Sequence, residues 1–369
     1  METAWLLLRS RFRYSSPSAS LIRFSSVVMG LIYGLALALS GVVKSVVLFM
    51  IAQGIICAFA MYAGSFCSIM LINIIWPNLK STVMGIMYGC STFGGALLAP
   101  IAVFFINKFS VGTALVLQGL AFAVIMFFCA MLIWDPSKGD KKQAEQMDKE
   151  SEIGEADAEA AQQMEAVFMP AKKIFTHPSI YLYILSIILI QLIGNLLVTD
   201  ASVLAIQNYG VTDAKAALAI SLMNIGAGFG GIICGILGDK LGHFKTTFLL
   251  GVLDGILIVA LGLLGLNTFG MFLALCVIQG FTYNGITALN PAMATNAWGE
   301  ASLGTSLALA SIGTIIVAII GPQLGLMVSI RSMLLICGLA SAAGGAIALL
   351  VSKLCTKYYK SVGSDVVVR

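Results

Sequence analysis

The sequence predicts an all-α membrane protein, a polytopic bundle of about ten transmembrane helices. Hydrophobic residues make up 59% of the 369 residues and charged residues only 10%, whereas an ordinary soluble domain carries about 25% charged residues. The mean hydropathy is +0.98. A helix needs about 20 apolar residues to cross a bilayer core, and ten segments reach this length without the alternating polarity of β-barrel strands. These segments are residues 25–45, 47–75, 83–107, 112–134, 178–205, 215–238, 245–266, 269–292, 302–326 and 331–354.

The charged residues divide the chain into two groups of helices. Sixteen of the 38 charged residues lie between Asp135 and Lys173, and a segment of this composition stays in water rather than in a core. It predicts a charged cytoplasmic linker after four helices and before six. The expected domains are an N-terminal tail at 1–24, a transmembrane bundle at 25–134, the linker at 135–177, a second bundle at 178–354 and a C-terminal tail at 355–369.

The basic residues predict the orientation in the membrane. If the N-terminus is cytoplasmic, 17 of the 21 Lys and Arg residues lie on the cytoplasmic side, as the positive-inside rule requires. We therefore predict an integral, multi-pass membrane protein with both termini in the cytoplasm. The basic, serine-containing residues 1–24 are also similar in composition to a transit peptide, although a basic cytoplasmic tail is the favoured interpretation.

Several function classes are disfavoured by what the sequence contains. The eight cysteines form no CxxC pair, and the two histidines, His177 and His243, are 66 residues apart, so a zinc or iron site has little support. No G-x-x-x-x-G-K-(S/T) loop is present, which argues against an ATP-driven pump. We expect no enzyme activity, no cofactor and no nucleic-acid partner; the expected partners are the lipid bilayer and a small-molecule solute.

The stretch GILGDKLGHFK, residues 235–245, concentrates charge between two apolar segments. Its glycines allow a tight turn and a close approach of helix ends. Asp239 can accept hydrogen bonds from the N-terminal amides of a neighbouring helix, while Lys240 and Lys245 add cytoplasmic positive charge. The pattern predicts a clamp at the water interface that holds one conformation closed and can be released.

This stretch resembles the loop motif of the major facilitator superfamily, G-x-x-x-D-(R/K)-x-G-(R/K)-x-(R/K). The matching positions are Gly235, Asp239, Lys240, Gly242 and Lys245. The resemblance implies a loop that gates the cytoplasmic side between helices eight and nine of twelve, with its Asp at the amino end of segment 83–107. His243 stands where Arg or Lys is usual, so its ionic contact is expected to weaken above neutral pH. Since twelve helices are usual, the resemblance implies an incomplete N-terminal half in which the first two helices are absent.

An internal repeat is typical of the same family. Gln53-Gly54 and Gln279-Gly280 both lie early in a helix. Each is followed by a tryptophan, Trp76 or Trp298, and then by a Gly-rich helix that ends in Pro. Such a parallel repeat is expected of two related transporter halves, although Gly-rich membrane helices can also look alike by chance. Segments 73–100 and 296–326 resemble the oxalate/formate antiporter and monocarboxylate transporter-like branch. Segments 215–238 and 302–326, in contrast, lack the mid-helix Lys or Arg with which oxalate-type carriers hold carboxylates.

Polar side chains inside apolar segments are candidate functional residues because they are costly there. Two stripes share the spacing i, i+4, i+8 and i+11: Gln191, Asn195, Thr199 and Ser202 in segment 178–205, and Gln279, Tyr283, Thr287 and Asn290 in segment 269–292. The resemblance places both stripes on cavity-lining helices. The candidate solute-pathway residues are Gln53, Gln191, Asn195, Thr199, Gln279, Tyr283, Thr287 and Asn290. The alternative is that they form hydrogen bonds between helices.

Two acidic residues are candidates for proton coupling. Asp254 lies near the middle of segment 245–266, and Asp200 lies in the outer part of segment 178–205. A lone acid within the membrane can gain and lose a proton as a cavity changes sides. The alternatives are that Asp254 is a protonated acid bonded to a neighbouring helix and that Asp200 faces external water.

The sequence favours a secondary active transporter, a symporter or antiporter, of small organic solutes. We expect monocarboxylate-type cargo, alternating access and proton coupling. One alternative is a truncated or accessory membrane protein without transport of its own, which would assemble with an unidentified membrane partner. The other is a carrier of neutral solutes such as amino acids or sugars.

Overall fold

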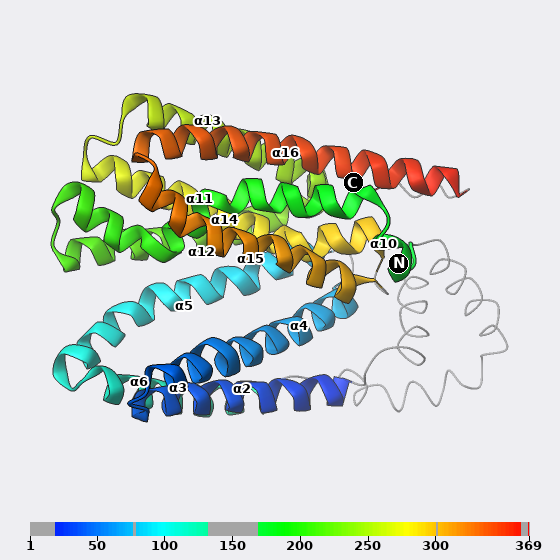
Figure 1. Ribbon diagram of the computed structural model, residues 1–369. Coiled ribbons are helices and arrows are strands. Elements are labelled where there is room, and N and C mark those ends of the chain that lie inside the picture. Colours follow the sequence, from blue (N-terminus) through cyan, green and yellow to red (C-terminus); the bar gives the residue numbers. More distant parts are fainter. Residues whose placement is uncertain (1–18, 77–78, 132–168, 300–301, 363–367, 369) are drawn as a thin grey trace, which may run out of the picture. The chain divides into compact units, whose positions relative to one another are not determined.

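The computed structural model describes residues 19–76, 79–131, 169–299, 302–362 and 368, and every regular element in these ranges is a helix (Figure 1). The elements are α2 Ala19–Val42, α3 Val46–Met50, the π-helical segment η1 Ile51–Cys57, α4 Ala58–Ile75, α5 Lys80–Lys108, α6 Val111–Met131, α10 Ala171–Ile174, α11 Pro178–Tyr209, α12 Asp213–Leu241, α13 His243–Leu264, α14 Phe269–Trp298, α15 Leu303–Met327 and α16 Ile330–Ser361.

The helices confirm the predicted fold class. Each of the ten apolar segments corresponds to a helix, and the second is composed of α3, η1 and α4 in direct succession. In the described ranges, eight helical stretches are long and apolar enough to cross a membrane. α16 continues beyond its predicted end at residue 354 to Ser361, because Lys and Tyr side chains there can extend a helix into the interface.

The chain forms two compact units. The first consists of Met1–Ile75 and Ala99–Met164, and the second of Trp76–Leu98 and Glu165–Arg369. Within the first unit, α2 packs along α6 and α4. A Cβ atom at Gly34 would lie 2.7 Å from the carbonyl oxygen of Gly119, so the backbones of α2 and α6 are in direct contact.

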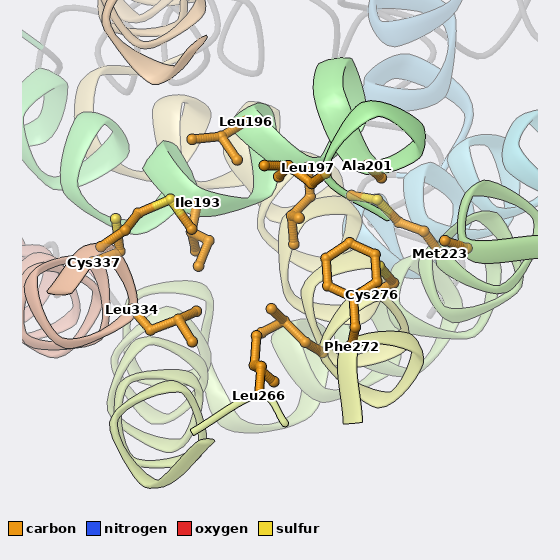
Figure 2. Close-up of a cluster of buried hydrophobic side chains, with 14 of the residues drawn as sticks. Ile193, Leu196, Leu197, Ala201, Met223, Leu266, Phe272, Cys276, Leu334 and Cys337 are labelled. Carbon is orange, nitrogen blue, oxygen red and sulfur yellow. The ribbon is translucent and has the colours of Figure 1, made fainter. Parts of the chain in front are cut away.

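Short connections make neighbouring helices of the second unit antiparallel. α12 and α13 are joined by Gly242 alone, whose φ of 98° is a conformation that favours glycine. α13 packs along α16, α12 along α14, and α11 along α15 and α16. Figure 2 shows the apolar core among these helices, where buried Ile193 and Leu197 of α11 lie near Phe272 of α14 and Leu334 of α16.

α12 and α14 approach each other through glycines. A Cβ atom at Gly230 would lie 2.1 Å from the carbonyl oxygen of Phe281, and one at Gly280 would lie 2.0 Å from that of Met223. Both distances are too short for a real carbon atom, so only glycine fits. Lipid removes the hydrophobic driving force between helices, and close contact between backbones is the main alternative source of attraction.

We expect Gly230→Ala to lower the thermal unfolding temperature of the purified protein, because the added methyl group must separate α12 from α14. Overpacking of this kind typically costs about 1–3 kcal/mol. Gly270→Ala is the matched control, since a Cβ atom there meets only Thr268 Oγ1 at 4.0 Å. Equal unfolding temperatures of the two variants in the same detergent would contradict the role of this contact.

Candidate functional site

Asp239 links the end of α12 to the beginning of α5. Its Oδ2 accepts a hydrogen bond from the backbone N–H of Thr82 at 2.8 Å, and its Oδ1 accepts one from the N–H of Ser81 at 3.1 Å. These amides belong to the first turn of α5, where no helical carbonyl is available to them. The carboxylate also lies at the positive end of the helix dipole. Asp239 therefore caps a neighbouring helix.

Glycines make this contact possible. A Cβ atom at Gly235 would lie 2.2 Å from the carbonyl oxygen of Ser81, and one at Gly85 would lie 2.1 Å from that of Gly231. Larger residues at these positions would move α5 away from α12 and lengthen the bonds of Asp239. The motif thus combines a carboxylate with the small residues that bring its partner within reach.

His243 extends the network from Asp239 to α14. Its Nε2 lies 3.4 Å from Asp239 Oδ1, and its Nδ1 lies 2.7 Å from Asn296 Nδ2. When Asn296 donates to Nδ1, the ring proton is on Nε2 and points at the carboxylate. Lys240 and Lys245 of the motif are exposed. Asn296 was not predicted, because nothing in the spacing of the motif indicates a partner 53 residues away.

Polar residues of α11 and α14 meet in the second unit. Gln191 Nε2 donates to Thr287 Oγ1 at 3.4 Å. Tyr283 packs on α11, where a Cβ atom at Gly194 would lie 2.8 Å from its ring. Both predicted stripes therefore contribute to one contact between two helices.

Among these polar residues of α11 and α14, Asn195 has a side-chain oxygen without a hydrogen-bond donor in the described part of the chain. Asn195 is 8% exposed, and this oxygen, Oδ1, is itself buried. A buried acceptor without a donor costs about 1–3 kcal/mol. A donor supplied by a bound molecule would recover this energy.

The other candidate solute-pathway residues are differently placed. Thr199 is exposed, and its hydroxyl donates to backbone carbonyls of its own helix. Asn290 accepts from the Tyr183 hydroxyl through both its backbone and its side-chain oxygen. Gln53 lies on η1 in the first unit, exposed, and accepts a weak bond from the Cys57 thiol at 3.9 Å.

Asp254 is the centre of a buried polar cluster between α13, α14 and α16. Its Oδ1 accepts from Gln279 Nε2 at 2.7 Å and from Thr282 Oγ1 at 2.9 Å, and its Oδ2 accepts from Ser341 Oγ at 2.8 Å. The residue is 1% exposed. The structure therefore brings together two residues, Asp254 and Gln279, for which the sequence predicts separate roles.

Those roles stay predictions, but the contacts bear on them. The amide of Gln279 is engaged by Asp254, so a solute could bind it only after this bond opens. Thr282 and Ser341 were not predicted, because a hydroxyl in an apolar helix is a weak signal. Asp200 is half-buried on α11 and has no hydrogen-bonding partner among the residues that the structure describes.

His177 is the N-cap of α11. Its Nδ1 accepts from the backbone N–H of Ser179 at 3.3 Å. Burial, and then the nearby charge of Lys173, lower the pKa of His177, which keeps the ring neutral and able to accept this bond. These contacts indicate that the role of His177 is to cap the N-terminus of α11.

The comparisons with known proteins point to one family. The sequence model of the Major Facilitator Superfamily matches residues 16–253 and 201–358. The solved structure of the proton:xylose symporter XylE bound to 6-bromo-6-deoxy-D-glucose aligns with a TM-score of 0.63 at 15% identity, over 98% of this chain and 84% of that chain. At this identity the likeness concerns the fold.

A bacterial homolog of the human lysosomal transporter Spinster, inward-facing and unoccupied, aligns with a TM-score of 0.47 at 14% identity, over 92% of this chain and 83% of that chain. No curated protein matches the sequence.

We expect Asp239→Asn to speed amide hydrogen exchange in the first turn of α5, because an amide side chain offers one acceptor oxygen in place of two charged ones. Hydrogen bonds to charged groups contribute about 1.5–3 kcal/mol, so exchange at Ser81 and Thr82 should rise about tenfold or more. Mass spectrometry of a peptide that covers these residues measures the change. Lys240→Gln is the control, and an equal increase in both variants would exclude the carboxylate as the cause.

We expect Asp254→Leu to destabilise the protein strongly, since Gln279 and Ser341 would lose the acceptor that they now have. Each buried group left without a partner costs about 1–3 kcal/mol. Asp254→Asn keeps one acceptor oxygen and the shape, so its unfolding temperature should lie between those of the wild type and Asp254→Leu. A wild-type unfolding temperature for Asp254→Leu would show that the cluster does not stabilise the fold.

Proposed function

Because this chain belongs to the Major Facilitator Superfamily of secondary transporters, we propose that it carries a small, neutral, hydrogen-bonding solute across a membrane by alternating access. The unpaired Oδ1 of Asn195 is the observation that carries this proposal. It is an acceptor that is buried, uncharged and available to a hydroxyl or N–H group of a solute.

The surroundings of Asn195 favour a neutral solute. Gln191 and Thr287 are neutral polar residues that bond to each other, and neither α11 nor α14 contains Lys, Arg or His. Burying a carboxylate without a cation is much more costly than burying a hydroxyl. The solved symporter of similar fold holds a sugar derivative, which is also a neutral, hydroxyl-bearing molecule.

A monocarboxylate is the second candidate cargo. The resemblance of segments 73–100 and 296–326 to the monocarboxylate transporter-like branch favours it. For that cargo the donors would be the amide hydrogens of Gln191 and Asn195, without a Lys, Arg or His countercharge on α11 or α14. An accessory protein without transport of its own remains the alternative from a different class.

Alternating access requires a contact that opens in each cycle, and we propose that the Asp239 contact with α5 is this gate. Its bonds are few, charge-assisted and half-buried, so water can replace them when the helices separate. We place this gate and both termini on the cytoplasmic side, in accordance with the distribution of Lys and Arg.

Proton coupling is proposed to involve Asp254 or Asp200. Asp254 has three neutral hydrogen-bonding partners and a buried position, so a change in its protonation would rearrange bonds among α13, α14 and α16. Asp200 has the more accessible position. The conservative Asp→Asn variants separate the two residues, since only the coupling residue should make uptake independent of a pH gradient.

Uptake into proteoliposomes tests the proposal. The purified protein is assayed with radiolabelled sugars, polyols and neutral amino acids and, in parallel, with small monocarboxylates, with and without a pH gradient. We expect saturable uptake of at least one neutral solute. Saturable uptake of monocarboxylates alone would replace the neutral cargo with the second candidate, and no uptake by well-folded protein would favour the accessory alternative.

We expect Asn195→Ala to raise the KM for the transported solute about tenfold, because one hydrogen bond of about 1.4 kcal/mol is lost. Asn208→Ala is the matched control, since Asn208 lies on the same helix but is exposed and bonds to the Leu204 carbonyl. Both variants should express as folded protein. Identical KM values would remove Asn195 from the solute pathway.

A further inference from the structure

A basic pocket lies where the beginning of α13 meets the end of α16. Lys245 of α13 and Lys353, Lys357 and Lys360 of α16 line a cavity of about 570 Å³. All four lysines are exposed, and the described residues that line the cavity include no acidic side chain. Four like charges in one place repel each other unless an anion compensates them.

The end of the chain forms part of this pocket. Val368, which also lines it, is buried; its N–H donates to Thr356 Oγ1 at 3.2 Å, and its carbonyl oxygen accepts from Ser352 Oγ at 2.6 Å. The cavity is thus built from three segments of the chain and is not only a row of surface lysines.

An apolar groove continues from the pocket along the same two helices. Phe248 of α13 and Ala346, Ile347 and Leu350 of α16 line a second cavity of about 360 Å³. Leu349 and Lys353 belong to both cavities. The basic pocket is therefore continuous with a groove that is lined by apolar side chains of the transmembrane helices α13 and α16.

We propose that this surface binds an anionic phospholipid, with its phosphate headgroup at the four lysines and an acyl chain in the groove. The lysines lie toward the helix ends that the Lys and Arg distribution predicts to be cytoplasmic, where lipid headgroups are expected. Each basic residue near an anionic headgroup raises the affinity for that headgroup about fivefold. The apolar groove favours binding of a lipid over binding of a soluble anion, because only a lipid has a hydrocarbon chain that can fill the groove.

Native mass spectrometry of the full-length protein in detergent, with added phosphatidylglycerol or phosphatidylcholine, tests this proposal. We expect preferential binding of phosphatidylglycerol. The triple variant Lys353→Gln, Lys357→Gln, Lys360→Gln should bind it on the order of a hundredfold more weakly. A triple control, Lys44→Gln, Lys215→Gln, Arg331→Gln, removes three exposed charges elsewhere and should bind like the wild type.

A second variant separates the lipid from a free phosphate. Ala346→Trp adds bulk to the groove at an exposed position and should weaken binding of phosphatidylglycerol without affecting the lysines. Inorganic phosphate at equal concentration should displace little lipid. Equal binding of the two lipids, equal loss in the two triple variants, or full displacement by inorganic phosphate would each overturn the proposal.

Discussion

The close approach of α12 to α5 and α14 is the constraint on which the second unit depends. Glycines at 230, 231 and 235 leave no room for a Cβ atom against the neighbouring backbones. The contact replaces the hydrophobic driving force that lipid does not provide. It also brings the first-turn amides of α5 within hydrogen-bonding distance of Asp239. Without the glycines, the carboxylate would have no helix terminus to cap.

Polar side chains of two kinds lie within the helices of the second unit, those of a cluster with all its hydrogen bonds made and one with an unpaired acceptor. The cluster around Asp254 is fully satisfied by Gln279, Thr282 and Ser341, and such a network holds helices in one arrangement. Asn195, in contrast, retains an unpaired acceptor in a buried position, and a group of this kind is available for a ligand. Because all the hydrogen bonds of Asp254 are made, we interpret its cluster as stabilising. Because Asn195 Oδ1 has no partner among the described residues, we interpret Asn195 as a candidate binding residue.

The proposed gate and the basic pocket lie at helix ends that the Lys and Arg distribution predicts to be cytoplasmic. Asp239 and Lys245 belong to one short motif, yet the carboxylate caps α5 whereas the lysine lines the cavity shared with α16. A lipid bound in that cavity would contact α13, which begins at His243, four residues after Asp239 of the proposed gate. The lipid could therefore influence where α13 lies. Binding free energy that differs between two conformations shifts their populations, so the proposed lipid would affect transport if its site changes as the gate opens.

The sequence by itself determined the fold class, the ten apolar segments and the motif at 235–245, because hydropathy and segment length are local properties that the bilayer thickness turns into helices. The resemblance of that motif to a known family also led to the expectation that Asp239 lies at the amino end of segment 83–107, where the structure has its hydrogen-bond donors Ser81 and Thr82. Only the tertiary structure decided that Gln279 bonds to Asp254, that Asn296 bonds to His243, and that lysines of α13 and α16 surround one cavity. These contacts depend on which helices pair and on how each is rotated about its axis, and nearly uniform apolar helices carry almost no periodic signal from which that rotation could be predicted.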